Sequence, residues 1–142
     1  MITHKQDEHV TSLEIYCDGA FSSLRQLGGW AIVVIRNGEK IHSSFFPISG
    51  GTNNTAEIQA VLEAINWAKE NNYNNLTILT DSMYVIGTAS KGWKRNKNIE
   101  LLANLDKAME NLKIEFKHVK GHEGNKWNEL CDALAVQATF IT

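Results

Sequence analysis

Two carboxylates stand directly after apolar, strand-like runs of this chain. Asp18 follows residues 13–17, in which apolar and polar side chains alternate, and Asp81 follows the apolar run LTILT. Ligands of open α/β sheets gather beyond the carboxyl ends of the strands, so two such strands in one sheet would bring these acids together. Carboxylates that close repel each other unless a cation lies between them. The pattern therefore predicts a site for a divalent cation.

Two predicted helices bring further acids towards the same place. Glu57 lies near the start of one helix, at the rim of its apolar stripe, and Asp132 lies on the flank of the apolar face of the last helix. Taken singly, each acid is as well explained by a surface or capping role, for example Asp81 with Ser82 as the cap of the next helix. The placement of all four favours a shared site over four unrelated ones.

The elements that must position these acids follow the order β-β-β-α-β-α-α-β-α. After the first strand, residues 13–17, we expect a loop with Gly28 and Gly29 and then a hairpin that turns at Asn37-Gly38. Three consecutive strands can form an antiparallel meander, whereas later strands that arrive through helices must lie parallel. The order predicts an α/β fold, with one mixed sheet flanked by helices.

Composition limits the class of protein. The chain has 142 residues and a net charge of −2, so polyanion binding would need local basic patches. We expect a flexible tail over residues 1–12 and a single domain over residues 13–142. Cys17 and Cys131 are too few and too far apart for a disulfide framework, and we interpret them as buried thiols in a reducing compartment. With no membrane-length apolar run and no signal peptide, we expect a cytoplasmic protein. We also expect a monomer.

Five motifs together resemble type 1 ribonuclease H, over nearly the whole chain. They are Asp18-Gly19-Ala20, TNNTAE at residues 52–57, DSMYV at residues 81–85, Lys120-Gly121-His122, and NELCD at residues 128–132. The resemblance implies the ribonuclease H fold, a five-stranded mixed sheet whose second strand is antiparallel to the rest. It also implies an endonuclease that hydrolyses the RNA strand of RNA–DNA hybrids and leaves 5′-phosphate and 3′-hydroxyl ends.

The same resemblance assigns roles to particular residues. Asp18, Glu57, Asp81 and Asp132 would be the catalytic, metal-binding carboxylates, and His122 the catalytic histidine of a mobile loop. Two Mg²⁺ ions are the expected cofactors, with Mn²⁺ as a possible substitute, because Mg²⁺ takes few carboxylates and keeps positions for water and substrate oxygens. Without the motif, His122 would be interpreted as a solvated loop residue.

The expected partner is an RNA–DNA hybrid, recognised through polar and basic segments. By resemblance, Asn53 and Asn54 contact the hybrid, and Thr52 with Asn98 matches a pocket for a DNA-strand phosphate. SKGWKRNKN, residues 90–98, supplies a basic loop around an aromatic residue, with Trp93 and Lys94 as substrate contacts. This segment is shorter than the basic protrusion of many relatives. Gly50 replaces an arginine that many relatives have, and Arg25 is one candidate to compensate.

Two alternatives remain open from the sequence. One is a noncatalytic nucleic-acid-binding module on the same fold, which four retained carboxylates oppose because they repel phosphate without a metal. The other is another ribonuclease H-like nuclease, which the polar run at residues 52–54 and the loop of His122 oppose. A chelator test and a comparison of hybrid with pure duplexes separate the three functions.

Overall fold

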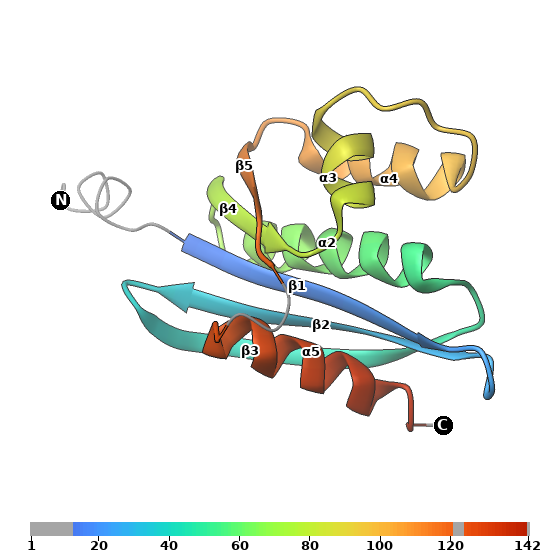
Figure 1. Cartoon of the computed structure of the whole chain (residues 1–142). Helices are drawn as coiled ribbons and strands as arrows, with labels where there is room; N and C mark the ends of the chain where they lie inside the picture. The colour runs from blue at the N-terminus through green and yellow to red at the C-terminus, as the bar shows by residue number, and fades with distance from the viewer. Residues whose placement is uncertain (1–12, 121–123, 142) are drawn as a thin grey trace, which may run out of the picture.

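The structure is a computed structural model that describes residues 13–120 and 124–141. A single five-stranded sheet lies at its centre, in the spatial order β3-β2-β1-β4-β5 (Figure 1). The strands are β1 Leu13–Ser22, β2 Leu27–Arg36, β3 Glu39–Ser49, β4 Asn75–Thr80 and β5 Lys113–His118. β2 pairs antiparallel with both β1 and β3, whereas β4 pairs parallel with β1 and β5. The predicted mixed sheet and the predicted order of elements are confirmed.

Four helices of the described residues cover the two faces of this sheet. They are α2 Asn53–Glu70, α3 Met83–Ser90, α4 Ile99–Met109 and α5 Lys126–Ala138. In Figure 1, α2, α3 and α4 lie on one side of the sheet and α5 lies on the other. None of these helices is both long enough and apolar enough to cross a membrane, in the part of the chain that the structure describes.

Each face of the sheet has its own hydrophobic core. Leu13, Ile15 and Cys17 of β1 point into the core that α2, α3 and α4 share, and Tyr16 points into the core beneath α5. This alternation follows from the pleat of a strand, in which successive side chains take opposite faces. Asp18 has the same parity as Tyr16, and the predicted inward orientation of Cys17 is confirmed by its exposure of 2%.

The prediction that β1 ends before Asp18 is wrong, because β1 continues to Ser22. Its pairing with β4 stops at Tyr16 and Leu79, but its pairing with β2 runs on to Ser22 and Leu27. The chain of β4 leaves the sheet to start α3, whereas β1 and β2 form one long hairpin. Asp18 therefore lies inside a strand, at the point where the sheet opens on one side.

The prediction of a loop at Gly28 and Gly29 is also wrong, because both residues belong to β2. A pair of glycines favours a loop, but the role of Gly29 here is close packing. A Cβ atom at Gly29 would lie 2.6 Å from the carbonyl oxygen of Ala135, on α5. The missing side chain lets α5 lie directly on the sheet.

The turn between β2 and β3 has the predicted residues in the predicted conformation. Asn37 and Gly38 both have positive φ, at 53° and 82°, as a type I′ turn requires. Pro47 lies in β3, which is an edge strand of the sheet, so its missing N–H leaves no central ladder bond unmade. These signals are local, and they set the β2–β3 hairpin, whose first strand pairs with β1, the strand that carries Asp18.

Candidate active site

Asp18 and Asp81 come together because β1 and β4 are parallel neighbours. Tyr16 pairs with Leu79 at the last register position of the two strands, and the two acids each follow that position by two residues. Asp81 stands just before α3, whose N-cap is Ser82, with its side chain accepting a hydrogen bond from Val85 N at 3.1 Å. Capping of α3 therefore falls to Ser82 and does not account for Asp81.

Glu57 joins these acids through the backbone of Gly19. The N–H of Gly19 donates to Asp18 Oδ1 and to Glu57 Oε1, each at 2.9 Å. The shared hydrogen bonds are possible because α2 approaches β1 closely. This approach leaves no room for a side chain at Gly19, since a Cβ atom there would overlap the backbone of Ala56 and lie 2.5 Å from Glu57 N. Glycine is thus required directly after Asp18. One N–H orients two carboxylates from different elements.

The three carboxylates form a cluster with the geometry of a cation site. One oxygen from each of Asp18, Glu57 and Asp81 lies within 4.8 Å of the others. Asp18 is 3% exposed, and its Oδ2 atom is buried without a hydrogen-bond partner among the described residues. A hard divalent cation would satisfy that oxygen and offset the repulsion between the acids. The donor set therefore fits a hard divalent cation.

Burial and mutual repulsion make these acids hard to ionise without a cation. The pKa of Asp18 is raised to about 10, chiefly by burial and then by the charges of Glu57 and Asp81. Burial and the charge of Asp81 also raise the pKa of Glu57 to about 8, against the opposing effect of the Gly19 N–H. Both acids therefore resist losing their protons in the metal-free protein, and a cation would displace those protons.

These shifts predict a pH-dependent stability with a definite sign. The folded protein binds the protons of Asp18 and Glu57 more tightly than the unfolded chain does. The contribution of these two groups to the unfolding free energy is therefore greatest below pH 4 to 5, and it falls as pH rises towards about 10. We expect the metal-free protein to lose about 2 kcal/mol or more of unfolding free energy between pH 5 and pH 9.

Urea unfolding at several pH values, in chelator and then in saturating Mg²⁺, checks this expectation. Mg²⁺ should restore stability most at the alkaline end, and Asp18→Asn should flatten the chelator profile. A profile in chelator that stays level from pH 5 to pH 9 would contradict the repulsion described here.

Asp132 comes to the cluster from the opposite side of the sheet edge, on α5. It lies outside the group of three that meets the 4.8 Å limit, but it is near enough to Asp18 for its charge to contribute to the raised pKa of that acid. Its neighbour Cys131 is fully buried against Tyr16 O and Ala31 O, so α5 is held tightly to β1 and β2.

His122, the fifth predicted catalytic residue, lies outside the described residues.

The polar segment before α2 begins the helix. Thr52 is the N-cap, with its hydroxyl accepting from Thr55 N at 3.2 Å and its N–H donating to Thr55 Oγ1 at 2.7 Å. Asn53 and Asn54 form the exposed first residues of α2, one turn before Glu57. Their amides therefore face solvent at the same end of the helix as an acid of the cluster.

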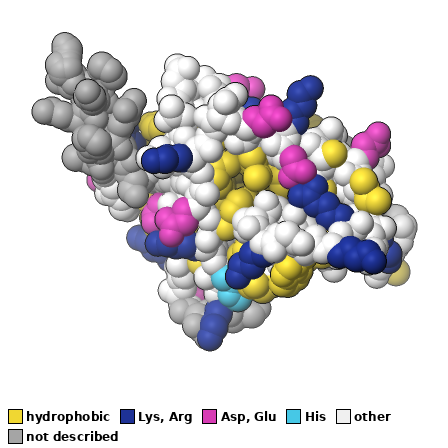
Figure 2. All heavy atoms as spheres, turned by 90° about the horizontal axis from the view of Figure 1, so that it is seen from above, with side chains coloured by type: hydrophobic (Ala, Val, Ile, Leu, Met, Phe, Trp, Pro, Cys, Tyr) yellow, Lys and Arg dark blue, Asp and Glu magenta, His cyan; other side chains and the backbone are white. Residues whose placement is uncertain are grey.

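The basic loop, residues 91–98, joins α3 to α4. Trp93 is 46% exposed and packs on α3, where a Cβ atom at Gly87 would overlap its ring. Asn98 is the first residue before α4, but its side chain donates to Tyr84 Oη at 3.0 Å rather than capping the helix. Lys94 is exposed. On this side of the molecule, Lys and Arg side chains form separate groups among neutral and acidic ones (Figure 2).

Two arginines are engaged within the protein rather than free for a polyanion. Arg95 was predicted to belong to the phosphate-facing surface, but its guanidinium forms a salt bridge with Asp106 at 2.6 Å. Arg25 was a candidate to compensate for Gly50, but it donates to Thr139 Oγ1 at 2.7 Å and stacks on Phe140. Thr139 is 114 residues from Arg25. Asp106 is 11 residues from Arg95 and lies on α4, so neither contact follows a local sequence pattern.

Sequence reasoning named the acids of the cluster but missed the group that orients them. The N–H of Gly19 is that group, and the signal was present as a glycine inside what proved to be a strand. A glycine in a strand interior indicates a close approach of another backbone, here that of α2.

A mixed sheet with a carboxylate cluster at the opening between two parallel strands defines an α/β protein with a candidate metal-dependent active site. The family model for RNase H matches residues 10–140. A ribonuclease H of Rhodopirellula baltica is 35% identical, with 97% of each chain covered. One from Treponema denticola is also 35% identical, over 89% of this chain and 96% of the other. The chain belongs to the RNase H family.

Solved structures agree with this fold. The RNase H1 of the archaeon Halobacterium salinarum has a TM-score of 0.79 at 22% identity, with 89% of this chain and 96% of that chain covered. The N-terminal RNase H domain of a Mycobacterium tuberculosis protein has a TM-score of 0.80 at 22% identity, covering 91% and 94%. At this level of identity, the likeness supports the fold.

Proposed function

We propose that this chain is an endonuclease that hydrolyses the RNA strand of RNA–DNA hybrids, with residues 13–142 acting as one ribonuclease H domain. Membership of the family supports the reaction. The observation that carries the proposal is the cluster of Asp18, Glu57 and Asp81 around a buried carboxylate oxygen without a partner in the described part of the chain. A site of this kind suits phosphodiester hydrolysis, which needs hard oxygen ligands.

Asp18, Glu57, Asp81 and Asp132 are proposed to hold two Mg²⁺ ions, with Mn²⁺ as a substitute. When bound, such ions supply a water nucleophile at neutral pH and stabilise the leaving oxygen, which gives 5′-phosphate and 3′-hydroxyl ends. The protein's own contribution is placement. Gly19 N–H fixes Asp18 and Glu57, and α3 begins directly after Asp81. His122 is proposed to move a proton near this site.

Discrimination between RNA and DNA is proposed to come from the start of α2. The 2′-hydroxyl is the group that distinguishes the strands, and it can both donate and accept hydrogen bonds. Asn53 and Asn54 offer exposed amides for this purpose, one turn from Glu57. Thr52 and Asn98 are proposed to border a site for a DNA-strand phosphate, with Trp93 and Lys94 as further hybrid contacts.

The buried, unpaired thiols of Cys17 and Cys131 support a reducing compartment such as the cytoplasm, where we propose that the protein acts as a monomer.

A cleavage assay with end-labelled substrates tests this function. We expect Mg²⁺-dependent cuts in the RNA strand of a hybrid, no cuts in chelator, and little cleavage of double-stranded RNA or DNA of the same sequence. Binding of the hybrid without cleavage at any metal concentration would favour a noncatalytic module. Rapid cleavage of either pure duplex would favour another nuclease on this fold.

A further inference from the structure

The loop from residue 91 to residue 98 is fixed to α3 at three points, although it has no regular secondary structure. Trp93 donates its N–H to Gly87 O at 3.1 Å and lays its ring on that glycine. Arg95 donates to Thr88 O at 2.7 Å, and Asn98 donates to Tyr84 Oη at 3.0 Å. The remaining cations of the loop, Lys91, Lys94 and Lys97, are exposed.

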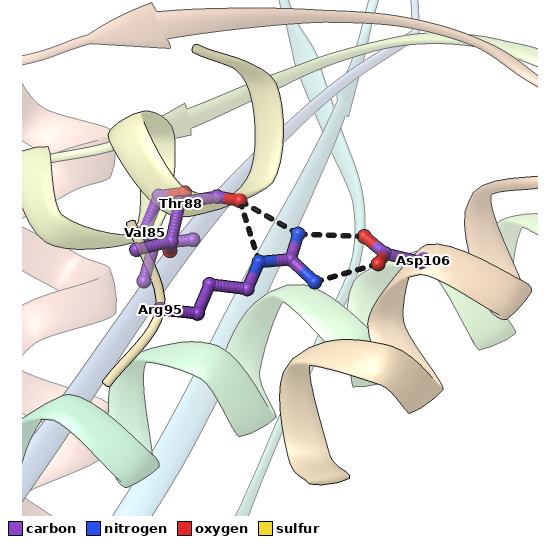
Figure 3. A network of polar contacts seen from close by, with 4 residues as sticks. All are labelled: Val85, Thr88, Arg95 and Asp106. Carbon is purple, nitrogen blue, oxygen red and sulfur yellow. Dashed lines mark hydrogen bonds and ion pairs between the residues drawn. The ribbon is translucent and has the colours of Figure 1, made fainter. Parts of the chain in front are cut away.

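Arg95 joins α3 to α4 through its side chain. Its guanidinium donates to both carboxylate oxygens of Asp106, at 2.6 and 2.8 Å, while two of its nitrogens donate to Thr88 O (Figure 3). A planar guanidinium can span a carbonyl and a carboxylate at once, which the single ammonium of lysine cannot do with the same geometry. Arg95 therefore joins the last turn of α3, the loop and the C-terminal half of α4.

α3 connects this loop to the acidic cluster. The helix begins directly after Asp81 and Ser82, and it is only eight residues long. A loop held against its far end is thus held at a set distance from the cluster. If the loop moved freely, its lysines would lose conformational entropy when they bound phosphates, and binding would weaken accordingly.

We propose that Arg95 is a positioning residue for hybrid binding. Through Asp106 and Thr88, it holds residues 91–98 as a preformed surface on which Lys94 and Lys97 meet the phosphates of the substrate. This inference rests on the proposed function and specifies how the site takes its hybrid. It also explains how a short loop can act as a binding surface without a helical protrusion.

The proposal makes an unusual prediction about the sign of one charge effect. Removal of the acid in Asp106→Ala would strengthen polyanion binding if only charge mattered. If Asp106 holds the loop through Arg95, the same change should raise KM for the hybrid about fivefold and leave kcat within about twofold. Glu110→Ala removes an exposed acid at the C-cap of the same helix, and it should leave KM unchanged or slightly lower.

The experiment measures KM, kcat and the salt dependence of hybrid binding for the wild type and the variants. Arg95→Ala and Arg95→Lys should both raise KM like Asp106→Ala, and the double variant Arg95→Ala/Asp106→Ala should be no worse than either single one. The slope of log K against log[salt] should stay at the wild-type value in Arg95→Ala. In Lys97→Ala it should fall by about 1, for one lost phosphate contact.

Hydrogen exchange gives a readout that does not depend on cleavage. Backbone amides of residues 93–98 should exchange faster in Arg95→Ala and Asp106→Ala, with the sheet amides unchanged. Asp106→Ala that behaves like Glu110→Ala, normal KM in Arg95→Lys, or a reduced salt slope in Arg95→Ala would each overturn the proposal. Wild-type protein that neither binds nor cuts the hybrid would instead overturn the proposed function.

Discussion

Replacement of Asp18 by asparagine is expected to lower hybrid cleavage at saturating Mg²⁺ on the order of a thousandfold or more. Asp18 is the most buried acid of the cluster, and its second oxygen has no partner among the described residues. The amide keeps the size of the side chain but cannot replace a charged metal ligand. Single-turnover cleavage of a labelled hybrid measures the loss.

The same variant should bind its substrate well and fold more stably. Asparagine cannot ionise, so folding no longer requires a buried carboxyl to keep its proton, a cost that burial and then the charges of Glu57 and Asp81 impose by raising the pKa of Asp18 to about 10. We therefore expect hybrid affinity to be kept or increased, and metal-free stability at pH 8 to rise by about 2 kcal/mol. Glu39→Gln, at an exposed acid at the start of β3, serves as a control that should change neither quantity. Cleavage by Asp18→Asn above about a tenth of the wild-type rate would refute the role of this acid.

Gly19→Ala is expected to have the largest effect on stability, about 3 kcal/mol of lost unfolding free energy. The added methyl group would overlap the backbone of Ala56, which neither rotamer changes nor side-chain movement can relieve. α2 would have to move away from β1. Glu57 would then move away from Asp18, and the Gly19 N–H would no longer reach both carboxylates.

Urea unfolding and hybrid cleavage together check the effect of Gly19→Ala. Gly28→Ala is a matched control in the paired strand, where the nearest backbone atom to an added Cβ is Ala20 O at 3.2 Å. We expect the control to cost less than about 1 kcal/mol and to keep its activity. Equal stability of the two variants would mean that contact between α2 and β1 does not depend on Gly19.

Much of the fold could be predicted because its signals are local. The Asn37-Gly38 turn, the Thr52 cap of α2 and the alternation in β1 are each set by a few neighbouring residues. The rule that strands joined through helices lie parallel then placed Asp18 and Asp81 side by side.

The contacts that could not be predicted join residues that are distant in sequence. Gly29 was interpreted as a loop glycine, since its partner Ala138 lies at the other end of the chain. The basic character of Arg95 predicted a phosphate contact, but Asp106, on α4, takes its guanidinium. Composition gives the charge of a side chain, whereas only the tertiary structure shows where that charge is used.

The central claim is that Asp18, Glu57 and Asp81 hold divalent cations. Anomalous diffraction from crystals of the protein grown with Mn²⁺ and a hybrid of a noncleavable RNA analogue tests it most directly. The claim predicts Mn²⁺ peaks bounded by the carboxylate oxygens of these three residues. Density for the bound hybrid with no Mn²⁺ at this cluster, or with Mn²⁺ only elsewhere, would contradict it.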